Sequence, residues 1–348
     1  MKLATVVAAS VLASSGLLTS AWADEPERDH DDSRKFSFAL WGDMPYVTPG
    51  TPDTQSAKIG PLIADINAAH VAFTIFDGDI KSGSSLCENG VYSTAIGYFS
   101  QFRAPMVYVP GDNEWTDCHR KNNGSYNNLE RLNYIRQTMF VSPVSFGKKP
   151  MALEHQGPLG GLYAENTRWK YGDVVFVGLN VPGSNNNLVK AGECISSKSV
   201  RTQIECDADT AEYLARDRAN IQFLHDSFAK ARAEKAVGLM VVIQADPGFD
   251  WPETETVDER TLPGLEGYTA FLAALATETA AYDGQVVLVH GDTHFFKIDK
   301  PLYGQANLLR NFTRVETFGS PNVHWVKVNV DPRSRNVFSF EPMIVPGN

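Results

Sequence analysis

The runs FSFALWGD at 36–43 and VAFTIFDGD at 71–79 are two of six segments that share one shape. Each is a short run of aliphatic, β-branched or aromatic residues that ends at a polar side chain, usually directly after glycine. The other four are APMVYVPGD at 104–112, DVVFVGLN at 173–180, GLMVVIQAD at 238–246 and QVVLVHGD at 285–292. Continuous apolar runs of this length are typical of parallel strands that are buried on both faces.

Amphipathic segments lie between several of these runs. Apolar residues recur at helical spacing in 57–70, 128–140, 209–235 and 268–282. This alternation of strands and helices predicts an α/β fold with a largely parallel core. The last part of the chain differs, because three short runs follow one another between turn residues: Arg314–Phe318, Val323–Val330 and Val337–Phe340. They predict an antiparallel meander at the edge of a second sheet.

The composition limits the class of protein. The 348 residues are 43% hydrophobic and 21% charged, which excludes a disordered or fibrous chain. The net charge of −10, without a basic run, argues against binding to a nucleic-acid duplex. No apolar run reaches the ~18 residues of a membrane-spanning helix, so we expect no stable membrane insertion. Nothing in the sequence specifies an oligomeric state.

The N-terminus has the pattern of an export signal. Lys2 precedes a small, apolar stretch at 3–18, and Ala21-Trp22-Ala23 forms an A-x-A cleavage site. We therefore predict a signal peptide at 1–23, a disordered leader at 24–35 and a single folded domain at 36–348. The expected location is outside the cytoplasm, secreted or periplasmic.

Export favours disulfide bonds between the four cysteines. Three pairings are possible. Cys194 and Cys206 enclose a short polar loop and form the pair that closes most easily, which leaves Cys87 and Cys118 as the second pair. The alternative is a four-cysteine zinc site, and the absence of any C-x₂-C spacing disfavours it.

Carboxylates follow five of the six predicted strands: Asp43, Asp79, Asp112, Asp246 and Asp292. Each one alone is a common turn residue or helix cap. Together they would meet at one edge of a parallel sheet, where ligands bind, and His294 would join them. Because carboxylates at close quarters repel one another, a bound divalent cation is the simplest relief.

The order and spacing of these motifs resemble those of the calcineurin-like metallophosphoesterases, over about 36–330. That family shows D-x-H, G-D-x-x-D, G-N-H-[D/E], a lone His and G-H-x-H. The corresponding segments here are GDMPY at 42–46, DGD at 77–79, PGDNEW at 110–115, QADP at 244–247 and HGDTH at 290–294. The resemblance implies a four-layer α/β/β/α sandwich with the site at the strand ends.

The resemblance also implies metal ligands. Asp43 would bind a first metal together with His294, and Asp79 would bridge two metals. Asp112 stands where the family has a metal-binding Asn. Asp292 stands at the first His of G-H-x-H, and Asp246 or Ala245 at the lone His.

Several family positions are changed. Pro45 cannot replace a His ligand, and Lys81-Ser82 stands where the second Asp of G-D-x-x-D is expected. Oxygen ligands with one imidazole favour Mn, Mg or Ca over Zn or Fe, and either one or two ions would fit.

The same resemblance points to residues beyond the metal. Asn113 takes the place of the catalytic His, which leaves the proton donor unassigned. We expect His119, on the loop that Cys118 would staple beside the site, to supply that proton; a surface His is the alternative. Lys81 and Arg120 are candidate phosphate contacts, with solvated surface charges as the alternative.

The resulting hypothesis is a secreted, metal-dependent phosphoesterase that hydrolyses phosphomonoesters or phosphodiesters of a small substrate through metal-activated water. Loss of the family's histidines supports a different class, a catalytically degenerate protein with a binding or structural role. Retention of so many carboxylates favours the enzyme.

Export should release a mature chain that begins at Asp24, because cleavage follows the small residues Ala21 and Ala23. N-terminal sequencing of the exported protein checks this. An exported chain that still carries Lys2 would contradict it.

Overall fold

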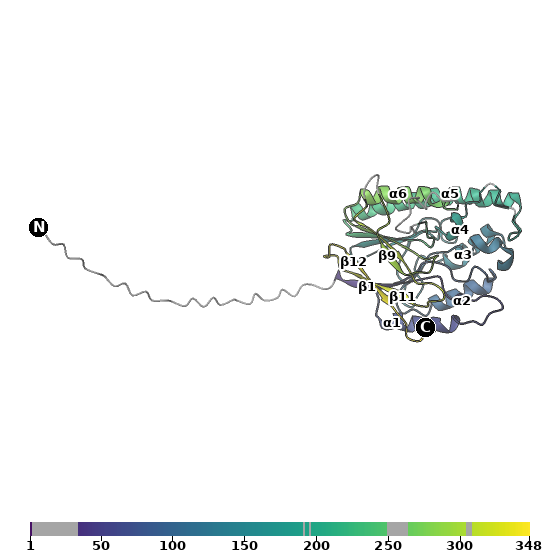
Figure 1. Cartoon of the computed structure of the whole chain (residues 1–348), viewed down its shortest axis with the longest axis horizontal. Helices are drawn as coiled ribbons and strands as arrows, with labels where there is room; N and C mark the ends of the chain where they lie inside the picture. The colour runs from purple at the N-terminus through teal and green to yellow at the C-terminus, as the bar shows by residue number, and fades with distance from the viewer. Residues whose placement is uncertain (2–33, 191, 195, 249–263, 304–307) are drawn as a thin grey trace. The chain divides into compact units, whose positions relative to one another are not determined.

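The computed structural model describes residues 1, 34–190, 192–194, 196–248, 264–303 and 308–348. Arg34–Asn348 forms one compact unit, and Met1–Ser33 is assigned to another. The predicted signal peptide and leader therefore lie outside the described residues, apart from Met1, Arg34 and Lys35. The compact unit contains two β-sheets with helices on their outer faces (Figure 1).

The first sheet has five strands in the order β12-β11-β1-β2-β3. Its parallel part consists of β1 (Phe36–Trp41), β2 (Thr74–Phe76) and β3 (Met106–Tyr108). On the other side of β1, β11 (Trp325–Val330) and β12 (Phe338–Met343) continue the sheet in antiparallel pairing.

The second sheet has seven strands in the order β4-β5-β6-β7-β8-β10-β9. Its parallel centre consists of β6 (Val174–Gly178), β7 (Gly238–Val242), β8 (Gln285–His290) and β10 (Phe312–Glu316). Three strands flank this centre in antiparallel pairing: β4 (Glu154–His155), β5 (Thr167–Tyr171) and β9 (Lys297–Asp299).

The helices cover the outer faces of the two sheets. Side chains of α1 (Ser56–Ala68), α2 (Asn89–Phe99) and α3 (Asn128–Met139) share one core cluster with the first sheet. Side chains of α5 (Gln203–Ala233) and α6 (Thr269–Ala280) share another with the second sheet. A third cluster, which includes Phe38, Phe73 and Phe176, fills the space between the sheets. The predicted four-layer α/β/β/α sandwich is therefore confirmed.

Short helices lie in the loops: α4 (Gly183–Asn186), η2 (Thr116–His119), η3 (Lys121–Asn123) and η5 (Glu266–Tyr268). None of the helices that the structure describes combines the length and apolar character needed to cross a bilayer.

The long helix α5 begins where its sequence supplies a capping box. Thr202 accepts a hydrogen bond from the backbone of Glu205, whose carboxylate in turn accepts one from the backbone of Thr202. This arrangement satisfies two backbone donors that a helix N-terminus leaves open.

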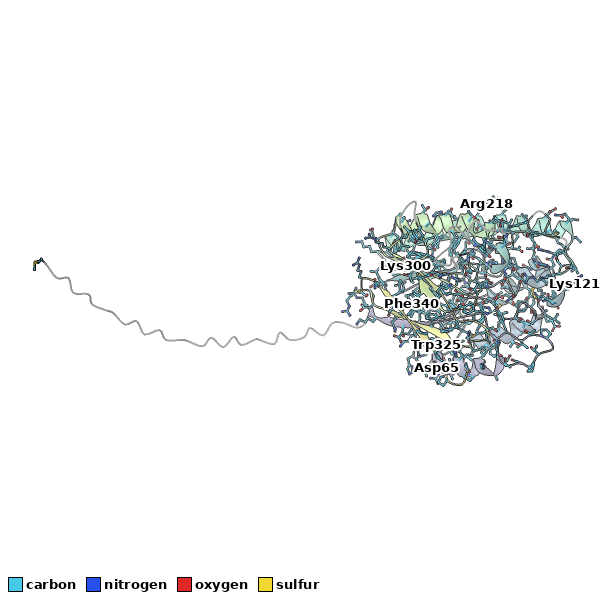
Figure 2. All side chains as sticks on the ribbon, in the orientation of Figure 1. Asp65, Lys121, Arg218, Lys300, Trp325 and Phe340 are labelled. Carbon is cyan, nitrogen blue, oxygen red and sulfur yellow. A yellow bond between two sulfur atoms is a disulfide. The ribbon has the colours of Figure 1, made fainter. Side chains whose placement is uncertain are left out.

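On the other side of the unit, Trp325 of β11 donates its indole N–H to Asp65 of α1 at 2.7 Å (Figure 2).

The predicted antiparallel meander at the C-terminus is confirmed for β11 and β12 and wrong for β10. β10 pairs in parallel with β8 in the second sheet, whereas β11 and β12 extend the first sheet beside β1. The chain thus changes sheets between Glu316 and Trp325. Local periodicity predicts that a segment is a strand but does not specify which sheet edge is open to it. Helix α2 was not predicted, because Asn89, Gly90 and Gly97 give its sequence the composition of a turn.

A buried ion pair connects the two halves of the sandwich. Arg136 of α3 donates to both carboxylate oxygens of Glu165, which lies between β4 and β5 of the second sheet. The side chains of the pair are 7% and 0% exposed. Asn180, after β6, also donates to Glu165 at 3.1 Å. Such a pair specifies geometry strongly, because either charge alone would be buried without compensation.

Replacing Arg136 with Met should therefore destabilise the protein by about 3–5 kcal/mol, since the charge of Glu165 would remain in the core. Lys170→Met is the control. It removes a pair with Glu234 whose side chains are 36% and 32% exposed, and it should cost less than about 1 kcal/mol. Thermal or urea unfolding at pH 7 measures both, and equal losses would contradict the structural role of Arg136.

Candidate functional site

The polar residues that follow the central strands lie together at one edge of the sandwich. Asp43, Asp79, Asp292 and His294 all have positive φ, between 50° and 76°. This backbone region is unfavourable for residues other than glycine and is found where the surrounding structure enforces it, often at functional sites. The loops are tied across the first sheet, where Asp43 N donates to Gly78 O at 2.8 Å.

Asp43 joins the two sheets. Asp292, after β8 in the second sheet, donates its backbone N–H to both carboxylate oxygens of Asp43 at 3.2 Å. A Cβ atom at Gly291 would lie 1.9 Å from Asp43 Oδ2. Only glycine therefore allows the second sheet to approach this carboxylate so closely.

Asp79 is surrounded by hydrogen-bond donors. Tyr46 Oη donates to its Oδ2 at 2.6 Å, and Asn113 donates from its backbone to Oδ1 at 3.1 Å. The side-chain amide of Asn113 reaches both Asp79 Oδ2 and Tyr46 Oη. Asn113, at the position that the resemblance gives to a catalytic His, thus lies beside the carboxylate expected to bind metal.

Gln244 connects two further carboxylates and was missed by the sequence analysis. Its Nε2 lies 3.2 Å from Asp292 Oδ1 and 3.5 Å from Asp112 Oδ1, while its Oε1 accepts a hydrogen bond from Gly183 N at 2.6 Å. Gln244 is the first polar residue after β7, which was the available signal. Its side chain, rather than that of Ala245 or Asp246, reaches the carboxylates.

Asp246 directs its side chain elsewhere. Its backbone N–H donates to Asp292 Oδ2 at 3.1 Å. Its carboxylate belongs to a separate buried group with His290 and Glu316, whose candidate ligand atoms lie within 4.8 Å of one another. The predicted ligands Asp43, Asp79, Asp112 and Asp292 are thus brought together, and the side chain of Asp246 is not part of that set.

His294 lies at the same edge and presents one nitrogen to it. Its Nδ1 is 2.8 Å from the carbonyl oxygen of Ser320, so this nitrogen carries the proton. The other ring nitrogen, Nε2, faces Asp43 Oδ1 at 3.6 Å. Burial alone would lower the pKa of His294, but its hydrogen bond to Asp43 and the charge of that carboxylate raise it.

Negative charge accumulates in the carboxylate cluster, which we define as Asp43, Asp79, Asp112 and Asp292. Asp43, Asp79 and Asp112 are 0%, 2% and 6% exposed, and Asp292 is partly buried. Burial, followed by the charge of Asp112, raises the pKa of both Asp79 and Asp292 well above the usual value. Because these negative charges repel one another, it is unfavourable for all the carboxylates to be ionised at once. Binding of a proton or a cation relieves the repulsion.

Lys81 is the predicted phosphate contact that lies closest to this charge in sequence. It is buried, and in the part of the chain that the structure describes its ammonium donates to Ser82 O at 2.8 Å rather than to a carboxylate. Burial lowers the pKa of Lys81, although the charges of Asp79 and Glu114 oppose that shift. The positive charge of this one ammonium group does not neutralise the negative charge of the carboxylate cluster.

Glu114 holds the loops that carry the cluster. Its Oε1 accepts hydrogen bonds from Gly111 N at 2.7 Å, Tyr108 Oη at 2.8 Å and Asp79 N at 3.2 Å. The carboxylate therefore fixes the ends of β2 and β3 relative to each other. Glu114 stands within the PGDNEW segment at 110–115, whose spacing alone does not indicate this role.

His119, the expected proton donor, lines a cavity beside Ser184 together with Arg120. Burial, with the neighbouring charges of Arg201 and Arg120, lowers the pKa of its imidazole to about 3. The ring is therefore neutral at pH 7, and its Nδ1 lies 2.9 Å from Ser199 Oγ. A lowered pKa disfavours the protonated ring that a general acid needs, and the role of His119 as proton donor stays a prediction.

Arg120 is linked to the cluster through other side chains. It forms an ion pair with the buried Asp117 and donates to Ser184 Oγ at 3.2 Å. Ser184 Oγ lies 2.7 Å from Asp112 Oδ2 and from Asp117 Oδ1. Arg120 also lines a cavity of ≈ 350 Å³ beside Ser184, together with Lys198. This placement suits a substrate contact next to the carboxylates.

Both predicted disulfide bonds are present, Cys87–Cys118 and Cys194–Cys206. The first ties the loop after β2 to the loop after β3, directly beside Asn113, whose carbonyl oxygen approaches both sulfur atoms. The second closes the loop that precedes most of α5. The two stapled regions meet where Lys121 N donates to Lys198 O at 2.9 Å.

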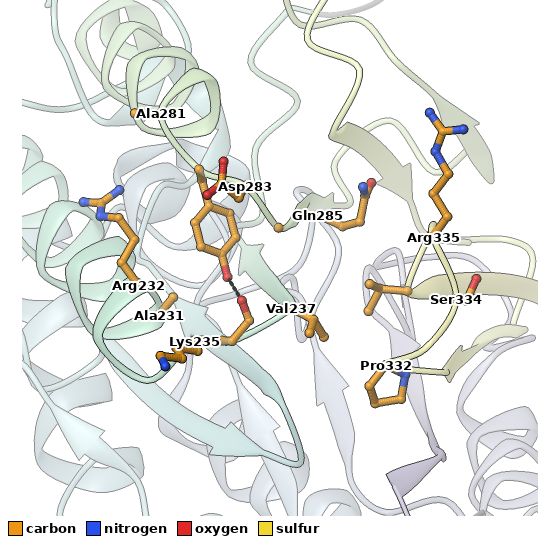
Figure 3. Close-up of a pocket in the computed structure, with 14 residues that line it drawn as sticks. Ala231, Arg232, Lys235, Val237, Ala281, Asp283, Gln285, Pro332, Ser334 and Arg335 are labelled. Atoms are coloured by element: carbon orange, nitrogen blue, oxygen red, sulfur yellow. Dashed lines mark hydrogen bonds between the residues drawn. The ribbon is translucent and has the colours of Figure 1, made fainter. Parts of the chain in front are cut away.

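A cavity of ≈ 660 Å³ lies at the opposite end of the strands (Figure 3). It is lined by Val237, which precedes β7, by Gln285, which opens β8, and by surface residues such as Arg232 and Arg335. Although it is larger than the cavity beside Ser184, it contains none of the clustered carboxylates. Size alone is therefore a poor guide to the site here.

The donor set of the cluster fits a hard divalent cation. Carboxylate oxygens, the amides of Asn113 and Gln244 and one imidazole nitrogen are available within a buried, negatively charged edge. Oxygen-rich sites of this kind suit Mg²⁺, Mn²⁺ or Ca²⁺ better than Zn²⁺.

The comparisons with known proteins agree with the architecture. No family model and no curated protein matches the sequence. Among solved structures, PhoD is similar with a TM-score of 0.51 at 10% identity, over 90% of this chain and 67% of that one. GAP50, the anchor in the inner membrane complex of Plasmodium, gives 0.44 at 12% identity over 90% of both chains. A purple acid phosphatase from yellow lupin seeds gives 0.48 at 13%, over 90% of this chain and 52% of that one.

The chain thus has the calcineurin-like metallophosphoesterase fold, as a divergent example. Likeness at this identity establishes the fold and leaves the activity to be argued from the residues themselves.

The raised carboxylate pKa values predict an unusual pH dependence for the protein in EDTA. Between pH 8.5 and 7 the folded state should begin to take up a proton that the unfolded state does not, at Asp117, whose pKa burial raises to about 7. The raised pKa values of Asp79 and Asp292 act in the same direction. Stability should therefore rise as the pH falls through this window, which lies above the usual pKa of His119. Thermal melts measure the slope, and Asp79→Asn should reduce it. A melting temperature that falls from pH 8.5 to pH 7 would contradict the crowding of these groups.

Proposed function

We propose that the protein is a metal-dependent phosphoric ester hydrolase whose divalent cation is held by the carboxylate cluster. The observation that carries this proposal is the convergence of Asp43, Asp79, Asp112 and Asp292 at one buried edge. A fold with no need for a cation there would gain stability by losing these charges. The fold that the chain shares with PhoD supports the proposal.

The chain's own residues divide into three roles. Asp43, Asp79, Asp112, Asp292 and Nε2 of His294 would hold one or two ions, with Mn, Mg or Ca favoured. A bound cation acidifies water and offsets negative charge on phosphoryl oxygens. Asn113 would donate a hydrogen bond to a phosphoryl oxygen by redirecting the amide N–H that now points at Tyr46 Oη.

Arg120 would position the substrate. Its guanidinium is held by Asp117 and Ser184 and lines the cavity next to Asp112. A fixed, forked donor of this kind suits the oxygen atoms of a phosphate group. The substrate we propose is a small phosphomonoester or phosphodiester, encountered outside the cytoplasm; the two disulfide bonds support that location.

One observation favours a non-catalytic protein instead. Asp43, Asp79, Asp112 and Asp292 all accept hydrogen bonds from the protein's own backbone, amide or hydroxyl groups. The cluster can therefore be satisfied internally, as a degenerate site with a binding or structural role would require.

Asp79→Asn separates the two functions. In the hydrolase it should remove an anionic ligand at nearly constant shape and lower kcat/KM by at least ~10³, about 4 kcal/mol of transition-state stabilisation. Asp246→Asn is the comparison, because its side chain faces the separate group with His290, and it should cost much less. The assay uses nitrophenyl phosphate and bis-nitrophenyl phosphate with added Mn²⁺ or Mg²⁺.

Elemental analysis and melts with and without EDTA complete this test. Binding of a cation at one hundred times its dissociation constant should add ~2.7 kcal/mol of stability. A wild-type protein without bound metal, with an unchanged melt and no activity on either ester or on nucleotides, would leave only the degenerate site.

A further inference from the structure

Tyr46 places its phenolic oxygen inside the carboxylate cluster. The oxygen lies 2.6 Å from Asp79 Oδ2 and 3.4 Å from Asp43 Oδ1, and Asn113 Nδ2 donates to it at 2.9 Å. The ring also meets the ring of His294 edge-on, with centroids 5.1 Å apart. One neutral hydroxyl thus contacts both carboxylates of the first sheet that the proposed cation would need.

We propose that the hydroxyl of Tyr46 and a divalent cation compete for the same place between Asp43 and Asp79, and that cation binding expels the hydroxyl. We call this competing hydroxyl the latch. This inference rests on the proposed function, because it needs a cation held by these two carboxylates. It goes further by naming the residue that controls how readily the site is loaded.

The hydrogen-bond pattern favours competition over joint binding. The hydroxyl carries one proton and directs it at Asp79 Oδ2. It also accepts a hydrogen bond from Asn113. A cation that approached the same Asp79 oxygen would meet the positive end of the O–H dipole, and the donor would have to leave.

The surroundings of Tyr46 allow its ring to leave. The backbone is anchored, because Tyr46 N donates to Gln55 Oε1 at 2.9 Å and Gln55 Nε2 donates to Ser320 Oγ at 2.7 Å. The residues that follow, 48–54, are exposed, and Tyr46 itself is only partly buried. A rotation of the side chain toward solvent would therefore leave the core packing in place.

Tyr46→Phe tests the latch through metal affinity rather than activity. The ring is retained and only the competing hydroxyl is lost, so the dissociation constant for Mn²⁺ should fall about tenfold, as measured by calorimetric titration or by electron paramagnetic resonance of free Mn²⁺. The variant should lose stability in EDTA by the corresponding amount, about 1.4 kcal/mol, and match the wild type when loaded. These two changes must agree, because the hydroxyl acts only on the metal-free state.

Tyr108→Phe is the matched control. Its hydroxyl is buried and donates to Glu114 Oε1 at 2.8 Å, but it is not hydrogen-bonded to Asp43 or Asp79. Loss of this hydrogen bond should lower stability with and without metal and leave the Mn²⁺ affinity unchanged.

The outcomes separate this inference from the proposed function. Mn²⁺ binding to the wild type with equal affinity in Tyr46→Phe overturns the latch alone. Weaker binding in the variant also overturns it and identifies Tyr46 as a ligand. If neither protein binds Mn²⁺, Mg²⁺ or Ca²⁺, the latch and the proposed metal site both fail.

Discussion

The burial of several carboxylates at one edge of the sandwich is the constraint on which the local structure depends. Asp43, Asp79 and Asp112 are almost inaccessible to solvent, and removing an anion from water is costly unless donors replace the lost hydration. The surrounding chain supplies those donors from backbone N–H groups, amides and hydroxyls. Positive φ angles at Asp43, Asp79 and Asp292 are the conformational cost of aiming the loops inward.

The two-sheet architecture makes this concentration possible. Asp43 and Asp79 follow strands of the first sheet, whereas Asp292 and Gln244 follow strands of the second. Hydrogen bonds between the two sheets, such as that from Asp292 N to Asp43, require the strands of both sheets to end at the same edge of the sandwich. Glu114 and the Cys87–Cys118 disulfide then hold the connecting loops, so that the cluster is supported by elements that do not themselves belong to it.

Much of this was predictable from the sequence, because the informative residues follow buried strands directly. Six apolar runs ending in polar residues predicted an α/β fold with a parallel core and the meeting of five carboxylates, of which the side chain of Asp246 points elsewhere, and the family resemblance implied the layers. The pairing of β10 with β8 was not predictable, since sheet assignment depends on which edges remain open after folding. Gln244 and Tyr46 were missed as site residues for a related reason: their roles come from where their side chains point, and spacing in the sequence does not encode that. The proton-donor role of His119 stays a prediction, and the burial and the charge of Arg201 that lower its pKa depend on tertiary contacts that the sequence does not show.

The two amides at this edge, Asn113 and Gln244, give the cluster more than one way to be satisfied. The side chains of Asn113 and Gln244 each carry a donor and an acceptor on the same planar group. Their NH₂ groups now face Asp79, Asp112 and Asp292, which satisfies carboxylates that would otherwise repel one another. Rotation of an amide would instead present its carbonyl oxygen, a ligand that hard cations accept. The same residues can therefore stabilise both the metal-free and the metal-bound cluster, and the balance between those states depends on small differences in free energy.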